Sequence, residues 1–279
     1  MNIPYLISTL DYRTNSMGIR ILHKLCKMIN DLGYEAYVNA KVTMKGSRTI
    51  YGNEPKLRQL IIDGAIAVYP EINKDNYLWS KNPVGWILND GEFNFEREGL
   101  VFTYSKRYRD CETLTIIEME KFFTDDKKYE RKYNTLYIGK GTADTRMNEI
   151  KDRYVITLTD PKTREKLADL LKRSKVFYTY DSRTALSSEA KLCGCPVVIL
   201  ENGINKLTDF NAFEGDPLGV TNNINLLDKA KCELALYPAV YQGISDKTEA
   251  EVVKFIKITQ EWARERLNGK TCENSVVNN

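Results

Sequence analysis

VFYTYDSRTALSSEAKLCGCPVVIL, residues 176–200, predicts a strand, a helix and a second strand in close succession. The first apolar run ends at Asp181, and a second carboxylate, Glu189, lies within the helix. Gly194 is placed to end that helix, and Val197–Leu200 forms the next apolar strand. Ligands of open α/β sheets bind at the carboxyl ends of strands, where helix N-termini attract phosphate. The segment therefore indicates a site for a ligand with phosphates and hydroxyls, such as a sugar nucleotide.

The same alternation of strand and helix patterns continues on both sides of this segment. Residues 18–32 carry apolar side chains at helical spacing, between predicted strands at Pro4–Leu10 and Glu35–Ala40. This opening is a parallel α/β unit. Further strands are predicted at Ala65–Tyr69, Val84–Leu88, Leu100–Tyr104, Thr135–Ile138, Arg153–Leu158 and Pro217–Val220, and further helices at Lys56–Asp63, Asp160–Arg173, Ile224–Leu236 and Thr248–Leu267.

Residues 176–200 resemble the donor-site signature of retaining GT-B glycosyltransferases. That signature has two acids separated by seven residues, a helix end of small residues, and a Pro-Val-Val strand. Asp181 stands where the family has its first Glu, and Glu189 is the second acid. The words VYPEI (68–72), GWILND (85–90) and YIGKG (137–141) add a similarity to bacterial polysaccharide-type, glycosyltransferase family 4-like enzymes. The resemblance implies an α/β fold with two Rossmann-like domains in a GT-B arrangement, facing a central cleft.

The domain boundaries follow from composition. Residues 118–133 are rich in charge and poor in aliphatic side chains, which is typical of a connection between domains. We therefore expect an acceptor-side domain over residues 1–118, a hinge over 119–133 and a nucleotide-sugar-binding domain over 134–245. Residues 246–267 are expected to form a C-terminal helix, and this helix could pack back on the first domain. Residues 268–279 are expected to be a disordered tail.

The resemblance also implies roles on the donor side. Glu189 would accept hydrogen bonds from the ribose diol, and Asp181 would contact the donor sugar, although Asp181 is equally suited to cap a helix. Lys140 would offset the charge that develops on the leaving diphosphate, with Arg146 as a second cation; an exposed lysine in a Gly-rich turn is the alternative. The free amides of residues 182–185, read as a first helical turn, would hold the diphosphate. The expected donor-binding residues are Gly139, Lys140, Thr159, Asp181, Ser182, Arg183, Thr184, Ala185 and Glu189.

The acceptor-side candidates follow the first strands. Asp90 lies where the family often has a His or Asp near the acceptor, so it is a candidate to orient the acceptor or accept its proton. Asn-Asp-Gly is also a good turn. Glu71, Ser16 and Gly18 complete the acceptor-side set. The candidate catalytic residues are Asp90, Lys140 and Asp181.

Composition restricts the other classes of function. The net charge of +3 over 279 residues gives no reason to propose nucleic acid as a partner. The sole histidine, His23, lies inside the first predicted helix, so a structural role is expected and a multi-histidine metal site is excluded. We find no Asp-x-Asp motif at a strand end and expect neither a metal nor a cofactor. The N-terminus has no signal-peptide pattern, so the cytoplasm is expected, with the inner face of a membrane as an alternative.

The sequence leaves two main hypotheses about the function, with a GT-B-like epimerase or phosphorylase as a weaker third. The first is an enzyme that moves a hexosyl-type unit from a nucleotide sugar to a glycan or lipid-linked acceptor, with retention and without a metal. The second is a catalytically degenerate GT-B-like protein that binds a nucleotide or glycan, or acts as a scaffold. The Asp at position 181 motivates the second reading.

Overall fold

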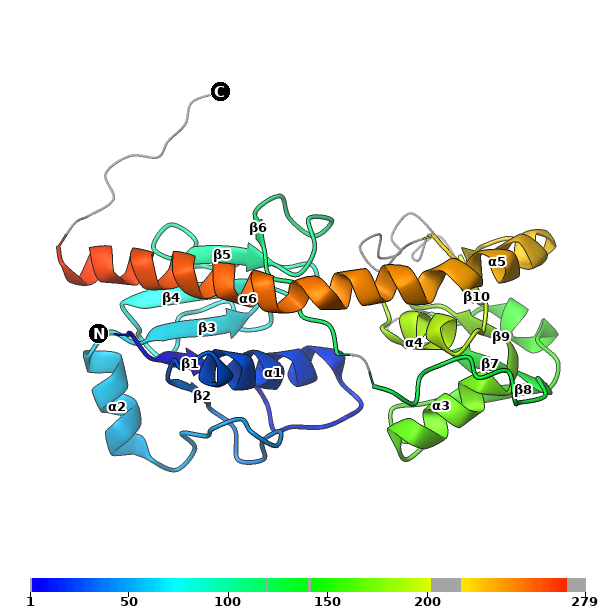
Figure 1. Ribbon diagram of the computed structural model, residues 1–279, viewed down its shortest axis with the longest axis horizontal. Coiled ribbons are helices and arrows are strands. Elements are labelled where there is room, and N and C mark those ends of the chain that lie inside the picture. Colours follow the sequence, from blue (N-terminus) through cyan, green and yellow to red (C-terminus); the bar gives the residue numbers. More distant parts are fainter. Residues whose placement is uncertain (1, 119, 140–141, 202–216, 270–279) are drawn as a thin grey trace, which may run out of the picture. The chain divides into compact units, whose positions relative to one another are not determined.

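A computed structural model describes residues 2–118, 120–139, 142–201 and 217–269 of the chain. It divides into two compact units, each with its own parallel sheet (Figure 1). Unit 1 comprises Met1–Ile117 with Lys247–Asn279, and unit 2 comprises Glu118–Asp246. Residues 119–133, predicted as a hinge, fall within unit 2 in this division. The predicted α/β class with parallel sheets is confirmed.

Unit 1 is built on a sheet whose strands run in the order β2 (Ala36–Val38), β1 (Tyr5–Ile7), β3 (Ile66–Pro70), β4 (Asn82–Ile87), β5 (Leu100–Thr103) and β6 (Glu112–Thr113). Neighbouring strands pair in parallel throughout. The strand order reverses between β1 and β3. Because ligands of such sheets bind where the order reverses, the carboxyl ends of β1 and β3 are the expected location in this unit.

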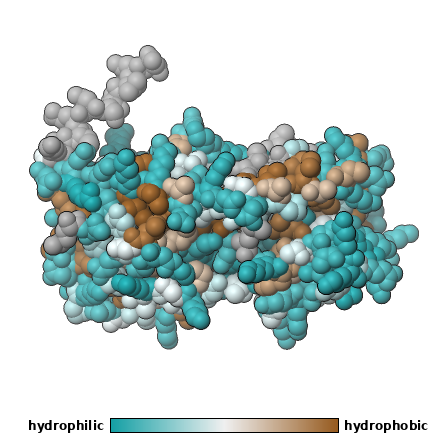
Figure 2. Space-filling model, viewed as in Figure 1, coloured by the Kyte–Doolittle hydropathy of each residue, from teal (hydrophilic) through white to brown (hydrophobic). Residues whose placement is uncertain are grey.

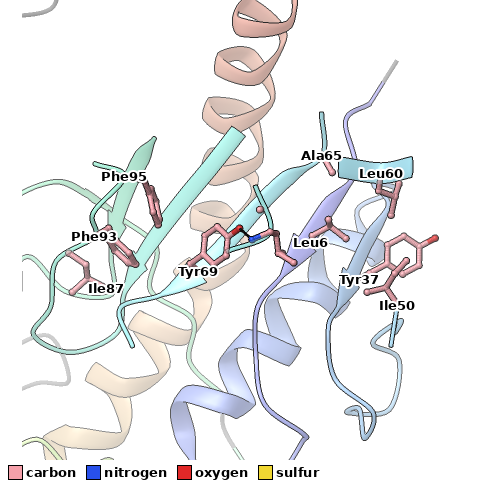
Figure 3. Close-up of a cluster of buried hydrophobic side chains, with 11 residues drawn as sticks. Leu6, Tyr37, Ile50, Leu60, Ala65, Tyr69, Ile87, Phe93 and Phe95 are labelled. Carbon is pink, nitrogen blue, oxygen red and sulfur yellow. Dashed lines mark hydrogen bonds between the residues drawn. The ribbon is translucent and has the colours of Figure 1, made fainter. Parts of the chain in front are cut away.

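Three helices flank the sheet of unit 1: α1 (Met17–Asp31), α2 (Glu54–Ile62) and the part of α6 (Tyr237–Leu267) from Lys247 onward. Alternate residues of β1 point to opposite faces. Leu6 belongs to a core cluster with Tyr69 and Phe93, in which the Tyr69 hydroxyl accepts a hydrogen bond from a backbone amide (Figure 3). Tyr5, on the other face, lies 6.0 Å from Phe255 of α6 between ring centroids. The C-terminal helix therefore forms part of the core of unit 1.

Unit 2 repeats the same plan. Its strands run in the order β11 (Val220–Thr221), β10 (Val197–Ile199), β9 (Ser174–Thr179), β7 (Tyr133–Tyr137) and β8 (Arg153–Ile156), all parallel. The order reverses between β7 and β9, so the loops after these two strands are the expected ligand location. Among the described residues of this unit, the helical elements are η1 (Thr145–Glu149), α3 (Arg164–Lys172), α4 (Leu186–Leu192), η4 (Ile224–Leu226), α5 (Leu227–Glu233), η5 (Leu234–Leu236) and the first part of α6.

Several predicted boundaries are wrong. Helix α3 starts at Arg164 rather than Asp160, because the Thr163 side chain caps it by accepting from the Lys166 amide. The peptide between Asp160 and Pro161 is cis and lies in the loop before the helix. Helix α6 begins at Tyr237, earlier than predicted. The strand predicted at residues 217–220 is β11, at Val220–Thr221.

The visible surface is mostly hydrophilic, with hydrophobic residues in separate patches (Figure 2). Within the described part of the chain, no helix has the length and apolar character needed to cross a bilayer.

Candidate functional site

The donor-side candidates gather at the carboxyl edge of the unit 2 sheet. The registers of β7, β9 and β10 place Tyr137, Thr179 and Ile199 side by side. The loops that follow these strands therefore leave the sheet at one edge. The backbone amide of Tyr180 donates to the Tyr137 carbonyl at 3.1 Å, which holds the ends of β7 and β9 together.

Gly139 and Asp181 meet where the strand order reverses. A Cβ atom added at Gly139 would lie 2.5 Å from Oδ2 of Asp181, and Gly139 has φ +58°. Both facts favour glycine at this position, because a side chain would displace Asp181 and left-handed backbone strains other residues. Lys140 and Gly141, the next two residues of the YIGKG motif, lie outside the described residues. The structure thus brings together two of the predicted donor-binding residues.

Asp181 also closes the turn that leads into α4. The side chain is 8% exposed, and its Oδ1 accepts from the Arg183 amide at 3.1 Å. The Asp181 carbonyl accepts from the Thr184 amide at 3.4 Å. Helix α4 begins only at Leu186, so the prediction that residues 182–185 form its first turn is wrong. Ser182, Arg183, Thr184 and Ala185 instead form a turn, and the amides of Arg183 and Thr184 bond within it.

Glu189 lies on α4, 5% exposed, and is engaged by an arginine that the sequence did not single out. Arg164 donates to both oxygens of Glu189: Nη1 to Oε2 at 3.0 Å, and Nη2 to Oε1. It also donates to Glu120 through Nε at 2.8 Å and Nη2 at 2.5 Å. The guanidinium lies 4.6 Å from the centroid of the Phe123 ring. Burial lowers the pKa of Arg164, but the two carboxylates outweigh it and raise that pKa above its ordinary value.

A second charged cluster surrounds Tyr180. The Tyr180 hydroxyl donates to Oδ1 of Asp144 at 2.7 Å, and Arg146 pairs with Oδ2 of Asp144 at 2.6 Å. Arg146 also donates to the carbonyl of Glu201, two residues after the end of β10. The pKa of Asp144 is held below its ordinary value, mainly by the hydrogen bond from Arg146 and next by the hydrogen bond from Tyr180. Arg146, the predicted second cation, is therefore fixed at the same edge of the sheet as Asp181.

Thr159 lies in an exposed turn after β8. The Thr159 and Asp160 amides donate to Oγ1 of Thr157 at 3.3 and 3.1 Å. Strand β8 is the edge strand next to β7, so this turn belongs to the same end of the sheet.

The acceptor-side candidates gather at the carboxyl edge of the unit 1 sheet. Oε2 of Glu71, after β3, accepts from the Leu88 amide at 2.9 Å, after β4. A Cβ atom at Gly91, the residue after Asp90, would lie 2.6 Å from Cβ of Glu71. A Cβ atom at Gly18, at the start of α1, would lie 3.7 Å from Cδ1 of Leu88. Ser16 is the N-cap residue of α1, although its side chain makes no capping hydrogen bond.

A hollow of about 440 Å³ opens at this edge of unit 1, next to β1 and β2. It is lined by residues 9–13, residues 39–41 and Tyr51. Oδ1 of Asp11 accepts from the Lys41 and Val42 amides at 2.7 and 3.0 Å. These hydrogen bonds join the loop after β1 to the loop after β2. None of the predicted acceptor-side residues lines this hollow. The hollow could not be predicted from the sequence, because the loops that line it carry no motif.

His23 supports the loops of this hollow from inside. It is fully buried, and its Nε2 lies 3.0 Å from the Leu10 carbonyl while its Nδ1 accepts from the Met44 amide at 3.4 Å. This pairing requires the neutral ring with its proton on Nε2. Burial lowers the pKa of His23. The contacts fit the structural role expected from the sequence.

Within the described ranges, no three histidine, cysteine, aspartate or glutamate side chains form a group that could hold a metal ion.

The fold resembles that of a solved glycosyltransferase. A glycosyltransferase from Rickettsia africae has a TM-score of 0.50 and 10% identity, over 95% of this chain and 99% of its own. Anabaena HepE, solved with UDP and glucose, has a TM-score of 0.45 and 10% identity, over 96% and 100% of the two chains. T4 phage BGT, solved with UDP and Mn²⁺, has a TM-score of 0.43 and 10% identity, over 96% and 99%. No protein-family description matches this sequence, and no curated protein does either.

Proposed function

We propose that the chain is a glycosyltransferase that takes a nucleotide-sugar donor in unit 2. The observation that carries the proposal is the meeting of Gly139 and Asp181 where the strand order of unit 2 reverses, in a fold shared with glycosyltransferases. The glycine removes steric bulk, so a ligand can approach the backbone. The carboxylate of Asp181 can accept hydrogen bonds from sugar hydroxyls.

The remaining donor contacts follow from the same edge. Glu189 would accept from the ribose hydroxyls, and Arg146 is held where it could meet a phosphate. Lys140 keeps its proposed role at the diphosphate, as the residue after Gly139 in the chain. A cation there would stabilise the negative charge of the leaving nucleotide. Retention of the anomeric configuration and independence of a metal are part of the proposal, because the spacing of the two acids resembles that of retaining enzymes.

The acceptor is proposed to bind unit 1. Asp90, Glu71, Ser16 and Gly18 stay candidates for its orientation, and Asp90 for accepting its proton. The hollow beside β1 adds tyrosines and two cations, Arg13 and Lys41, that could contact a glycan or the phosphate of a lipid-linked acceptor. A lipid-linked acceptor would bring the protein to the inner face of a membrane.

The test is an activity assay with purified protein. UDP-, GDP- and ADP-sugars are incubated with a panel of glycans and lipid phosphates, and products are followed by NMR. We expect transfer, or slow donor hydrolysis, with an α-linked product from an α-linked donor. The assay is run with Mn²⁺ and with a chelator, and equal rates are expected. An inverted product would overturn the retaining mechanism, and a rate that requires Mn²⁺ would overturn metal independence.

The second candidate is a binding protein without turnover. The observation that favours it is that both acids already have partners within the chain, Asp181 in its turn and Glu189 with Arg164. Such a protein binds the nucleotide but gives neither transfer nor hydrolysis with any donor in the same assay.

A further inference from the structure

We propose that Arg164 is a positioning residue of the donor site. It fixes the orientation of the Glu189 carboxylate, and it connects that carboxylate to Glu120 near the start of unit 2. The inference rests on the proposed function, because Glu189 is the residue proposed to bind the ribose.

The geometry of the pair is that of two parallel hydrogen bonds. Nη1 and Nη2 of Arg164 face Oε2 and Oε1 of Glu189, so the planar fork matches the planar carboxylate. The side chain of Arg164 is 12% exposed and that of Glu189 is 7% exposed. The fork therefore fixes the plane of the Glu189 carboxylate and the directions of its two oxygens.

The surroundings of Arg164 hold the guanidinium in place. Thr163 caps α3, so Arg164 is the first residue of the helix. Its Nε and Nη2 donate to Glu120, and its guanidinium stacks on the buried ring of Phe123. Both partners belong to the segment that opens unit 2. A substitution at Glu120 can thus affect Glu189 without contact with a ligand.

The balance of charge makes the arginine necessary. Two carboxylates share one guanidinium, and all three side chains are at most 20% exposed. Removal of the cation would leave two acids together in a poorly solvated place, which strongly disfavours their ionised forms. The thiol of Cys193, which follows the last residue of α4, is a further titratable group near Glu189. Without Arg164, Glu189 would take up a proton at higher pH, and the protonated group would be a weaker acceptor for hydroxyls than the carboxylate.

The test compares Arg164→Lys, Arg164→Met and Glu120→Gln with the wild type, by calorimetric titration with UDP, GDP and ADP at pH 7.5 and pH 5. Arg164→Met should weaken binding about tenfold or more, with a larger loss at pH 5. Arg164→Lys should regain part of the affinity, since lysine keeps the charge but not the fork. With an active donor, KM should rise more than kcat falls.

The matched control is Arg109→Lys in unit 1. Arg109 forms the same type of fork with Glu96, through hydrogen bonds of 2.5 and 2.6 Å. The Arg109→Lys substitution should therefore leave the affinity for nucleotides unchanged. Circular dichroism checks folding; if Arg164→Met unfolds, the milder Arg164→Lys and Glu120→Gln carry the test. Wild-type affinity in both milder variants would overturn the inference alone. Failure of the wild type to bind any of the three nucleotides would overturn the inference and the proposed function together.

Discussion

Gly139 lies so close to Asp181 that a methyl group at Gly139 would sit 2.5 Å from the aspartate Oδ2. The two residues follow β7 and β9, which are neighbours in the sheet although 42 positions apart in the chain. Their contact marks the point where the strand order of unit 2 reverses. A ligand that binds at this point would meet both residues.

Gly139→Ala should damage the site. The added methyl group must displace Asp181, and φ +58° costs a non-glycine residue about 1–2 kcal/mol. We expect a matching loss of unfolding free energy and weaker nucleotide binding, measured by urea titration and calorimetry. The control is Gly243→Ala on α6, where nothing lies within 4 Å of an added Cβ atom. It should be neutral or stabilising by up to about 1 kcal/mol. Equal stability of the two variants would contradict the close approach.

His23 should make the stability of the protein depend on pH. Burial lowers its pKa in the folded state, so between that pKa and about 6.5 the unfolded chain binds more protons. Stability contributed by neutral His23 is therefore present above about pH 6.5 and is lost as pH falls toward the folded-state pKa. Urea titrations at pH 7.5 and 5.5 measure this loss.

The His23→Gln variant serves as the comparison, because it has no imidazole to titrate and the chain has no other histidine. Its stability should fall less than that of the wild type between the two pH values. An identical fall would exclude His23 as the cause. A single imidazole resonance in the NMR spectrum allows its pKa to be read directly.

Phe255→Ala should destabilise unit 1 by about 3–5 kcal/mol. The ring is fully buried and lies 4.8 Å from the Phe102 ring and 6.0 Å from the Tyr5 ring between centroids. Its loss opens a cavity between α6 and the sheet. Val253→Ala, at a position 48% exposed on the same helix, should change stability by less than about 0.5 kcal/mol. Thermal and chemical unfolding measure both, and a mild effect of Phe255→Ala would argue against the role of α6 in this core.

The sequence predicted most of the strands and the class of fold, because apolar runs and helical spacing are local properties. It also placed Gly139 and Asp181 at one edge, since parallel strands end together. It did not reveal Arg164, because the pairing with Glu189 joins positions 25 apart that only the packing of α3 on α4 brings together. The helix start near Asp181 was misplaced because side-chain and backbone oxygens of Asp181 compete for the amides of a first helical turn.

Less of the acceptor side could be predicted from the sequence. Glu71 and Asp90 follow apolar strands and were found by that rule, but the hollow beside β1 is formed by loops. Loop walls have no periodic pattern, and their positions are set by contacts such as those of His23 and Asp11.

The most direct measurement is calorimetric titration of UDP, GDP and ADP into the wild type, Glu189→Gln and the exposed control Glu165→Gln. At least one nucleotide should bind the wild type with one-to-one stoichiometry. Glu189→Gln should weaken that binding about tenfold or more, and Glu165→Gln should leave it unchanged. Binding of none of the nucleotides, or equal affinity in all three proteins, would contradict the assignment of the donor site to this edge of unit 2.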